Sequence, residues 1–165
     1  MDDSCLSLQE YWLKHRMNIA ALRKWENPKG TMAGYNYRMK LLATAEPELI
    51  TIKPIKDLIL VDILKVIEKV QAKRTETTAL GKSTLSGCGS LIRDILGHAE
   101  LAGLPVRNLN KYENTILNQN INELCSALYG QADERIRRTS AKDYEKDYEE
   151  ELEELIAQKR IFASP

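Results

Sequence analysis

Residues 83–105 read STLSGCGSLIRDILGHAELAGLP and carry the strongest structural signal in the chain. Apolar side chains recur there every three or four residues, as they do on one face of an amphipathic helix. Ser83 or Thr84 can cap the start of such a helix, Gly103 is placed to end it, and Pro105 follows. We therefore predict a helix that ends near Ala102. Its expected core positions are Leu85, Leu91, Ile92, Ile95, Leu96, Ala99 and Leu101.

Three further helices are predicted on the N-terminal side of this stretch. Ser7 and Glu10 have the spacing of a capping box, which predicts a helix to about Trp25 that Asn27-Pro28-Lys29-Gly30 would stop. The next helices are expected over Thr31–Ala45 and Leu58–Val70, with an irregular link between Pro47 and Pro54. Their expected core residues are Leu8, Tyr11, Trp12, Ile19, Leu22, Tyr35, Met39, Leu42, Ile59, Ile63, Val66, Ile67 and Val70.

The C-terminal third is also expected to be helical. Residues 71–82 are polar and predict a loop, and residues 110–129 predict an Asn-rich helix. Residues 141–160 are strongly helical in pattern and rich in acidic side chains. A narrow apolar stripe runs along them through Tyr144, Tyr148, Leu152 and Leu155. About six helices and no sheet result, so the predicted fold class is all-α.

Composition narrows the class of protein. The 165 residues are 43% hydrophobic and 29% charged, which suits one soluble domain or a domain with a helical arm. Cys5, Cys88 and Cys125 are far apart and form no CxxC pair, so we expect free thiols in a reducing cytosol, without zinc or disulfides. No apolar run approaches the roughly 20 residues of a membrane span. The acidic start of the chain argues against a secretory signal.

Charge is distributed unevenly although the formal net charge is zero. Between residues 14 and 40 the only acidic residue is Glu26. The basic residues of that stretch are Lys14, Arg16, Arg23, Lys24, Lys29, Arg38 and Lys40. Such a stretch is either a solvated helix face or a surface that contacts nucleic acid.

No constellation of residues predicts an enzyme. His15 and His98 have no Ser or Cys partner at a suggestive spacing. Gly81-Lys82-Ser83 resembles the end of a Walker motif, but position 76 is Glu76 rather than glycine and no strand precedes it. The acidic side chains near the C-terminus have the character of a solvated face. We therefore predict no catalytic residues, no metal site, no cofactor and no small-molecule substrate.

Several motifs gain meaning when they are taken in order along the chain. They are Leu8-Gln9-Glu10-Tyr11-Trp12, then Thr31-x3-Tyr35-x2-Arg38, Ile52–Leu58, Val61-Asp62-Ile63, Lys82-Ser83-Thr84 and Ala99-Glu100-Leu101-Ala102-Gly103-Leu104. Together they resemble the core-binding domain of tyrosine recombinases, the phage-type integrases, over roughly residues 6–107. The resemblance implies a four-helix, SAM-like core-binding bundle over residues 1–107. Residues 108–165 would then form additional C-terminal helices, as an extension or a linker toward a catalytic domain.

The chain also departs from the family pattern. The turn after the final glycine is Arg107-Asn108-Leu109 instead of the usual Asn-Pro. The family's catalytic His-x-x-Arg is absent, because Asn18 follows His15 and Leu101 follows His98 at the third place. About 60 residues after the matched region are too few for the catalytic domain. We therefore expect no strand cleavage by this chain, and none of its tyrosines is predicted to be a nucleophile.

The function that the resemblance implies is binding of double-stranded DNA during site-specific integration or recombination by a mobile element. It implies a cytoplasmic protein, bacterial or phage-encoded, with no membrane partner, and it is compatible with a homo-oligomer on DNA. The candidate DNA-contacting residues are Lys29, Thr31, Tyr37, Arg38, Lys40, Lys73, Arg74, Lys82, Ser83, Thr84, Gly87 and Arg93. Close approach of DNA to the backbone would explain why Gly87 and Gly89 are tolerated in a helix, although each costs roughly 1 kcal/mol relative to alanine.

Two other interpretations stay open at this point. Ser83 and Thr84 could serve only as caps, and the glycines could serve only helix packing. The alternative function is a protein-interaction module, in which the acidic 141–160 segment and its Tyr/Leu stripe dock on a partner.

Overall fold

The computed structural model describes residues 2–72, 74 and 79–138, with side chains described as far as Ser126. This part of the chain is all-α and contains no β-strand. Five α-helices make up the body: α1 (Leu8–Arg23), α2 (Pro28–Ala45), α3 (Leu60–Ala72), α4 (Lys82–Leu101) and α5 (Lys111–Arg138). Short helical turns complete it at η1 (Asp3–Cys5), η2 (Glu48–Ile52) and η3 (Ile55–Asp57).

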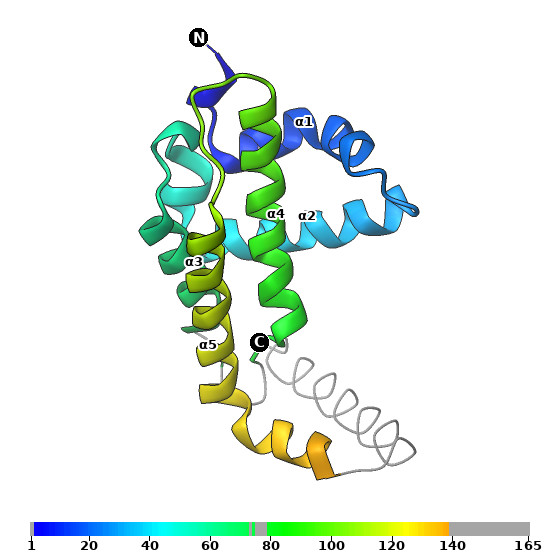
Figure 1. The fold of residues 1–165 in the computed structure, drawn as a ribbon, viewed down its shortest axis with the longest axis vertical. Coiled ribbons are helices and arrows are strands. Elements are labelled where there is room, and N and C mark those ends of the chain that lie inside the picture. The colour runs from blue at the N-terminus through cyan, green and yellow to red at the C-terminus, as the bar shows by residue number, and fades with distance from the viewer. Residues whose placement is uncertain (1, 73, 75–78, 139–165) are drawn as a thin grey trace, which may run out of the picture.

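Helix α4 lies at the centre of the arrangement. Figure 1 shows α2 crossing it, α1 near its C-terminal end, and α3 and α5 side by side along its other flank. Side chains from all five helices form one hydrophobic cluster. The burial of Leu85, Leu91 and Ile95 at 0% exposure confirms the predicted apolar face of α4. The pattern of residues 83–105 is explained by this position, because α4 has neighbours on several sides.

Helix α1 begins as its sequence predicts. The Ser7 hydroxyl accepts from the Glu10 backbone N–H at 3.2 Å, and the Glu10 carboxylate accepts from the Ser7 N–H at 3.3 Å. The helix ends at Arg23, two residues before the predicted end, because Lys24 adopts a left-handed conformation with φ of 53°. The capping box is therefore confirmed.

The starts of α2 and α4 differ from the prediction. Asn27-Pro28-Lys29-Gly30 was expected to stop one helix, but Asn27 caps α2, accepting from the Gly30 N–H at 3.2 Å, and Pro28 is its first residue. Gly81, not Ser83 or Thr84, is the N-cap of α4. Proline fits the first helical position because its missing N–H has no partner there in any helix. Ser83 and Thr84 therefore lie inside the first turn of α4.

The end of α4 confirms the assigned role of Gly103. This residue has φ of +81°, which only glycine adopts readily. Its N–H donates to the Glu100 carbonyl at 3.1 Å, and the Leu104 N–H donates to the Ala99 carbonyl at 3.1 Å. These two bonds form a Schellman motif, which reverses the chain toward α5.

Three residues predicted for the core are instead exposed. Leu22 is 50% exposed, Ile59 59% and Leu101 74%. Each lies at a helix end: Leu22 and Leu101 belong to the last turns of α1 and α4, and Ile59 precedes the first residue of α3. Helical periodicity does not reveal where the neighbouring helix ends, and these predictions were wrong for that reason.

The core continues past residue 107. Leu117 and Ile121 of α5 are at most 1% exposed and belong to the same cluster as α1 to α4. Helix α5 extends to Arg138, beyond the predicted end at residue 129. The predicted helix over residues 141–160 lies outside the described residues. No helix in the part of the chain described here is long and apolar enough to cross a membrane.

Candidate nucleic-acid interface

The crossing of α2 and α4 lies between two segments that carry basic residues and no acidic ones. Helix α2 carries Lys29, Arg38 and Lys40 and no acidic residue along its whole length. The first twelve residues of α4, from Lys82 to Arg93, also contain no acidic residue. Two adjoining helices therefore present positive charge with little compensation. This is the electrostatic pattern that a polyanion requires.

Arg38 lies at the centre of this crossing. A Cβ atom added to Gly87 would stand 2.3 Å from Arg38 Nε and 2.5 Å from Cζ, so the guanidinium occupies the space that the missing side chain leaves. A Cβ on Gly34 would come within 3.8 Å of Arg38 Nη1. The guanidinium carbon is 5.3 Å from the centroid of the Tyr35 ring, within range of a cation–π interaction. Gly87 is thus accounted for by contact with α2, and Arg38 has no ion-pair partner in the described part of the chain.

Tyr35 ties the two helices together beneath Arg38. Its hydroxyl donates to Asp94 Oδ2 on α4 at 2.9 Å, and Arg23 Nε lies 3.5 Å from Asp94 Oδ1. Burial and the bond to Asp94 raise the pKa of Tyr35 to about 12, so the hydroxyl keeps its proton. Asp94 and Arg23 compensate each other, whereas Arg38 remains available to a ligand.

The start of α4 offers further hydrogen-bond donors. The N-cap residue, Gly81, has no side chain to bond the first-turn N–H groups. Lys82 and Ser83 are exposed and Thr84 is half-buried. A helix N-terminus with open N–H groups favours an anion such as phosphate.

A buried glutamine fixes where this turn lies. Gln71 is 1% exposed, and its amide bonds both backbone groups of Leu80, donating to the carbonyl and accepting from the N–H, each at 2.9 Å. These bonds join the end of α3 to the residue before Gly81. Sequence reasoning missed Gln71 because its neighbours predicted a polar loop.

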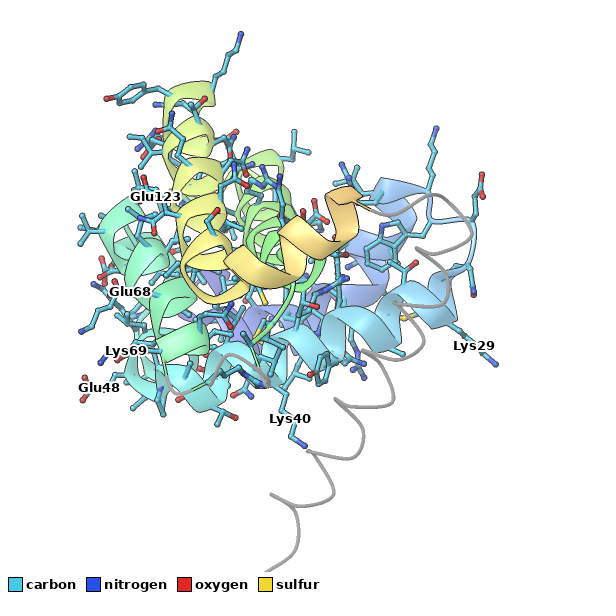
Figure 2. The ribbon with its side chains drawn as sticks, turned by 90° about the horizontal axis from the view of Figure 1, so that it is seen from below. Lys29, Lys40, Glu48, Glu68, Lys69 and Glu123 are labelled. Atoms are coloured by element: carbon cyan, nitrogen blue, oxygen red, sulfur yellow. The ribbon has the colours of Figure 1, made fainter. Side chains whose placement is uncertain are left out.

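The predicted residues on α2 divide between two sides of the helix. Thr31 and Arg38 are seven residues apart, about two turns, and share the side toward α4. Lys29 and Lys40 are eleven residues apart, about three turns, and also share a side. Nine residues, about two and a half turns, separate Lys29 from Arg38, which puts them on opposite sides. Figure 2 shows Lys29 and Lys40 pointing away from the helical body, and Tyr37 is 47% exposed.

The remaining predicted residues do not join the crossing. Arg93 donates to Ser90 Oγ at 3.1 Å and to Asn114 Oδ1 at 3.2 Å, which directs it toward α5. Arg74 is half-buried, and its N–H donates to the Gln71 carbonyl at 3.0 Å. Lys73 lies outside the described residues. The crossing thus brings Arg38 into contact with Gly87, while Thr31 shares the Arg38 side of α2, and Lys82, Ser83 and Thr84 form the first turn of α4.

The two histidines form a separate cluster between α1 and α4. Tyr11 Oη and His98 Nδ1 are hydrogen-bonded at 2.7 Å, and His15 Nε2 bonds Asp3 Oδ2 at 2.7 Å. The two imidazole centroids are 5.2 Å apart. Burial lowers the pKa of His98, and so does charge on His15, while burial raises the pKa of Tyr11 to about 12. Within the described residues no group of three or more His, Cys, Asp or Glu side chains could hold a metal ion.

A groove that the sequence did not reveal lies between α1 and α2. It has a volume of about 350 Å³, and its lining residues include Arg16 from α1 and Lys40 from α2. Arg16 belongs to the basic stretch found in the sequence, but nothing local to α1 indicates that it lies near Lys40, 24 positions further along.

Comparison of the chain with protein-family models, curated proteins and solved structures found no match.

Proposed function

We propose that this chain binds duplex DNA as the non-catalytic helical part of a tyrosine recombinase. The observation that carries the DNA-binding proposal is the crossing of α2 and α4, in which Arg38 and Lys82 have no acidic partner within the described residues and Asp94 is paired with Arg23. The recombinase assignment rests on the order of motifs over residues 6–107, which resembles the core-binding domain of that family.

The chemistry of the crossing suits the phosphate backbone. Arg38 and Lys82 supply charge, Ser83 and Thr84 supply hydroxyl donors, and the first turn of α4 supplies open N–H groups. Neutralising phosphates releases condensed counterions, so affinity depends steeply on salt. Contact with about four phosphates would weaken binding by roughly 100-fold between about 50 and about 200 mM salt.

The test is fluorescence anisotropy of a labelled random-sequence duplex across that salt range. Arg38→Gln and Lys82→Gln should each weaken binding about 8-fold at about 100 mM salt and lower the log–log salt slope by about one. Lys69→Gln is the matched control, because Lys69 is an exposed lysine beside Glu68 on α3, away from Lys29 (Figure 2). The control should bind like the wild type.

Two results would contradict the proposal. One is the absence of binding at about 50 mM salt. The other is an equal loss in Lys69→Gln and Arg38→Gln, which would indicate diffuse attraction rather than a defined face. The non-catalytic part of the proposal predicts that a duplex carrying a nick gives no covalent protein–DNA adduct on a denaturing gel, and an adduct would refute that part.

A further inference from the structure

The groove between α1 and α2 is a built feature rather than a gap between side chains. Its volume is about 350 Å³. Its lining includes the buried side chains of Trp12 and Met39, which are 1% and 4% exposed, together with Arg16, Asn36 and Lys40. No acidic side chain is among its lining residues.

One hydrogen bond fixes the polar wall of the groove. Trp12 Nε1 donates to Asn36 Oδ1 at 2.8 Å. The indole N–H can only donate, so the amide must turn its oxygen toward Trp12. The NH₂ group of Asn36 is therefore left to donate to another molecule, and Asn36 is exposed to solvent.

The two cations of the groove are uncompensated. Among the described residues, neither Arg16 nor Lys40 has an ion-pair or hydrogen-bond partner. Other cations of the same basic stretch do have one: Lys14 bonds Asp3 at 2.8 Å, and Arg23 lies 3.5 Å from Asp94. Two positive charges and an amide donor at the lining of one groove match an anion with several acceptor oxygens.

The position of the groove identifies the anion. Asn36 and Arg38 are two residues apart on α2, more than half a turn, so the groove flanks α2 on the side away from the crossing with α4. A helix about 10 Å wide that lies along a DNA groove has a phosphate strand on each flank. We infer that the α1–α2 groove holds one backbone phosphate of duplex DNA between Arg16, Asn36 and Lys40. This inference rests on the proposed function and adds α1 to the DNA-contacting surface.

The chain contains a built-in reporter of this groove. It has two tryptophans, so a ¹⁵N–¹H spectrum shows two indole N–H signals. Trp12 donates into the groove wall, whereas Trp25 packs on Tyr35 with ring centroids 5.0 Å apart. Trp25→Phe assigns the two signals. Titration with a 16-base-pair duplex at low salt should shift the Trp12 signal more than the Trp25 signal.

Substitution of the two cations tests whether they share one phosphate. If the phosphate releases its counterion only while both cations hold it, Arg16→Gln should weaken duplex binding about 8-fold at about 100 mM salt. Because Lys40 acts on the same phosphate, Arg16→Gln/Lys40→Gln should lose less than the product of the two single losses. Lys69→Gln remains the control. Unchanged thermal melting of each variant shows that the fold is intact, since neither side chain is in the core.

Each outcome distinguishes this inference from the proposed function. If Arg38→Gln loses affinity while Arg16→Gln binds like the wild type, the proposed function stands and the groove inference is overturned. If the affinity loss of the double variant equals the product of the two single losses, the claim that Arg16 and Lys40 hold the same phosphate is overturned. If no duplex binds, both fail. A shift of the Trp12 signal by adenosine monophosphate, without any by the duplex, would assign the groove to a free nucleotide instead.

Discussion

Replacing Gly87 with alanine would separate two explanations for this glycine. In the structure, the new methyl group would stand 2.3 Å from Arg38 Nε and 2.5 Å from Cζ, closer than van der Waals contact permits. The atoms in conflict are the far end of a flexible side chain, not backbone. The Arg38 guanidinium would therefore leave its place over α4 while both helices stay where they are.

Gly87→Ala should have two opposing effects on stability that nearly cancel. Alanine in place of a mid-helix glycine stabilises by about 1 kcal/mol. Moving the guanidinium off the Tyr35 ring, whose centroid is 5.3 Å away, costs about 0.5–1 kcal/mol. The free energy of unfolding, measured by urea denaturation, should stay within about 0.5 kcal/mol of the wild-type value.

DNA binding, in contrast, should become weaker in this variant. If Arg38 neutralises a phosphate from its present position, Gly87→Ala should weaken duplex binding up to the roughly 8-fold loss expected for Arg38→Gln. The double variant should then bind no more weakly than Arg38→Gln alone, because both changes remove the same contact. Anisotropy titrations of the wild type, both single variants and the double variant complete the cycle.

The opposite pattern would refute this reasoning. If the affinity loss of the double variant equals the product of the two single losses, Gly87 allows the DNA backbone to approach α4 directly, which is the explanation that the sequence suggested. Gly89→Ala is the matched control within α4: its added Cβ would lie 3.3 Å from Cδ2 of the buried Leu117, on the side toward α5. That variant should alter stability through packing and leave DNA affinity unchanged.

Three further predictions concern stability. Burial lowers the pKa of His98 below that of the unfolded chain, so the unfolded state binds the proton more readily. The free energy of unfolding should therefore fall as pH drops below about 6.5, and urea melts from pH 7.5 to 5 should show a smaller fall in His98→Gln. Tyr35→Phe removes the 2.9 Å bond to Asp94 and should cost about 1.5–2 kcal/mol by the same measurement; a cost near zero would mean that water replaces the hydroxyl. Gln71→Ala leaves the N–H and carbonyl of Leu80 without their partners and should cost about 2–4 kcal/mol, whereas a loss under about 0.5 kcal/mol would contradict the bracing role of Gln71.

The sequence predicted the helices well because their signals are local. The capping box of Ser7 and Glu10 and the left-handed Gly103 each depend on residues within a few positions. The prediction failed where one signal has two meanings. Asn27 and Pro28 occur both after a helix ends and where one begins, and the structure has Asn27 as a cap for the helix that follows.

The site was less predictable because its geometry is not local. Arg38 and Gly87 are 49 positions apart, and only the crossing of α2 and α4 brings them together. The basic stretch between residues 14 and 40 covers most of α1 and most of α2. It could not indicate that Lys29 and Arg38 occupy opposite sides of α2, or that Asp94 from a distant segment compensates Arg23. Helical spacing would have shown that Lys29 and Arg38 lie on opposite sides of α2. The pairing of Arg23 with Asp94 could be seen only in the tertiary structure.

A net charge of zero does not argue against DNA binding by this chain. At about 0.1 M salt the Debye length is about 10 Å, so a phosphate responds mainly to charges within that range. Helix α2 and the first twelve residues of α4 contain no acidic side chain, and Glu68 on α3 points away from Lys29 and Lys40 in Figure 2. Local charge should therefore determine the salt slope. If distant acids mattered equally, Glu68→Gln would strengthen binding as much as Arg38→Gln weakens it, and we expect Glu68→Gln to have almost no effect.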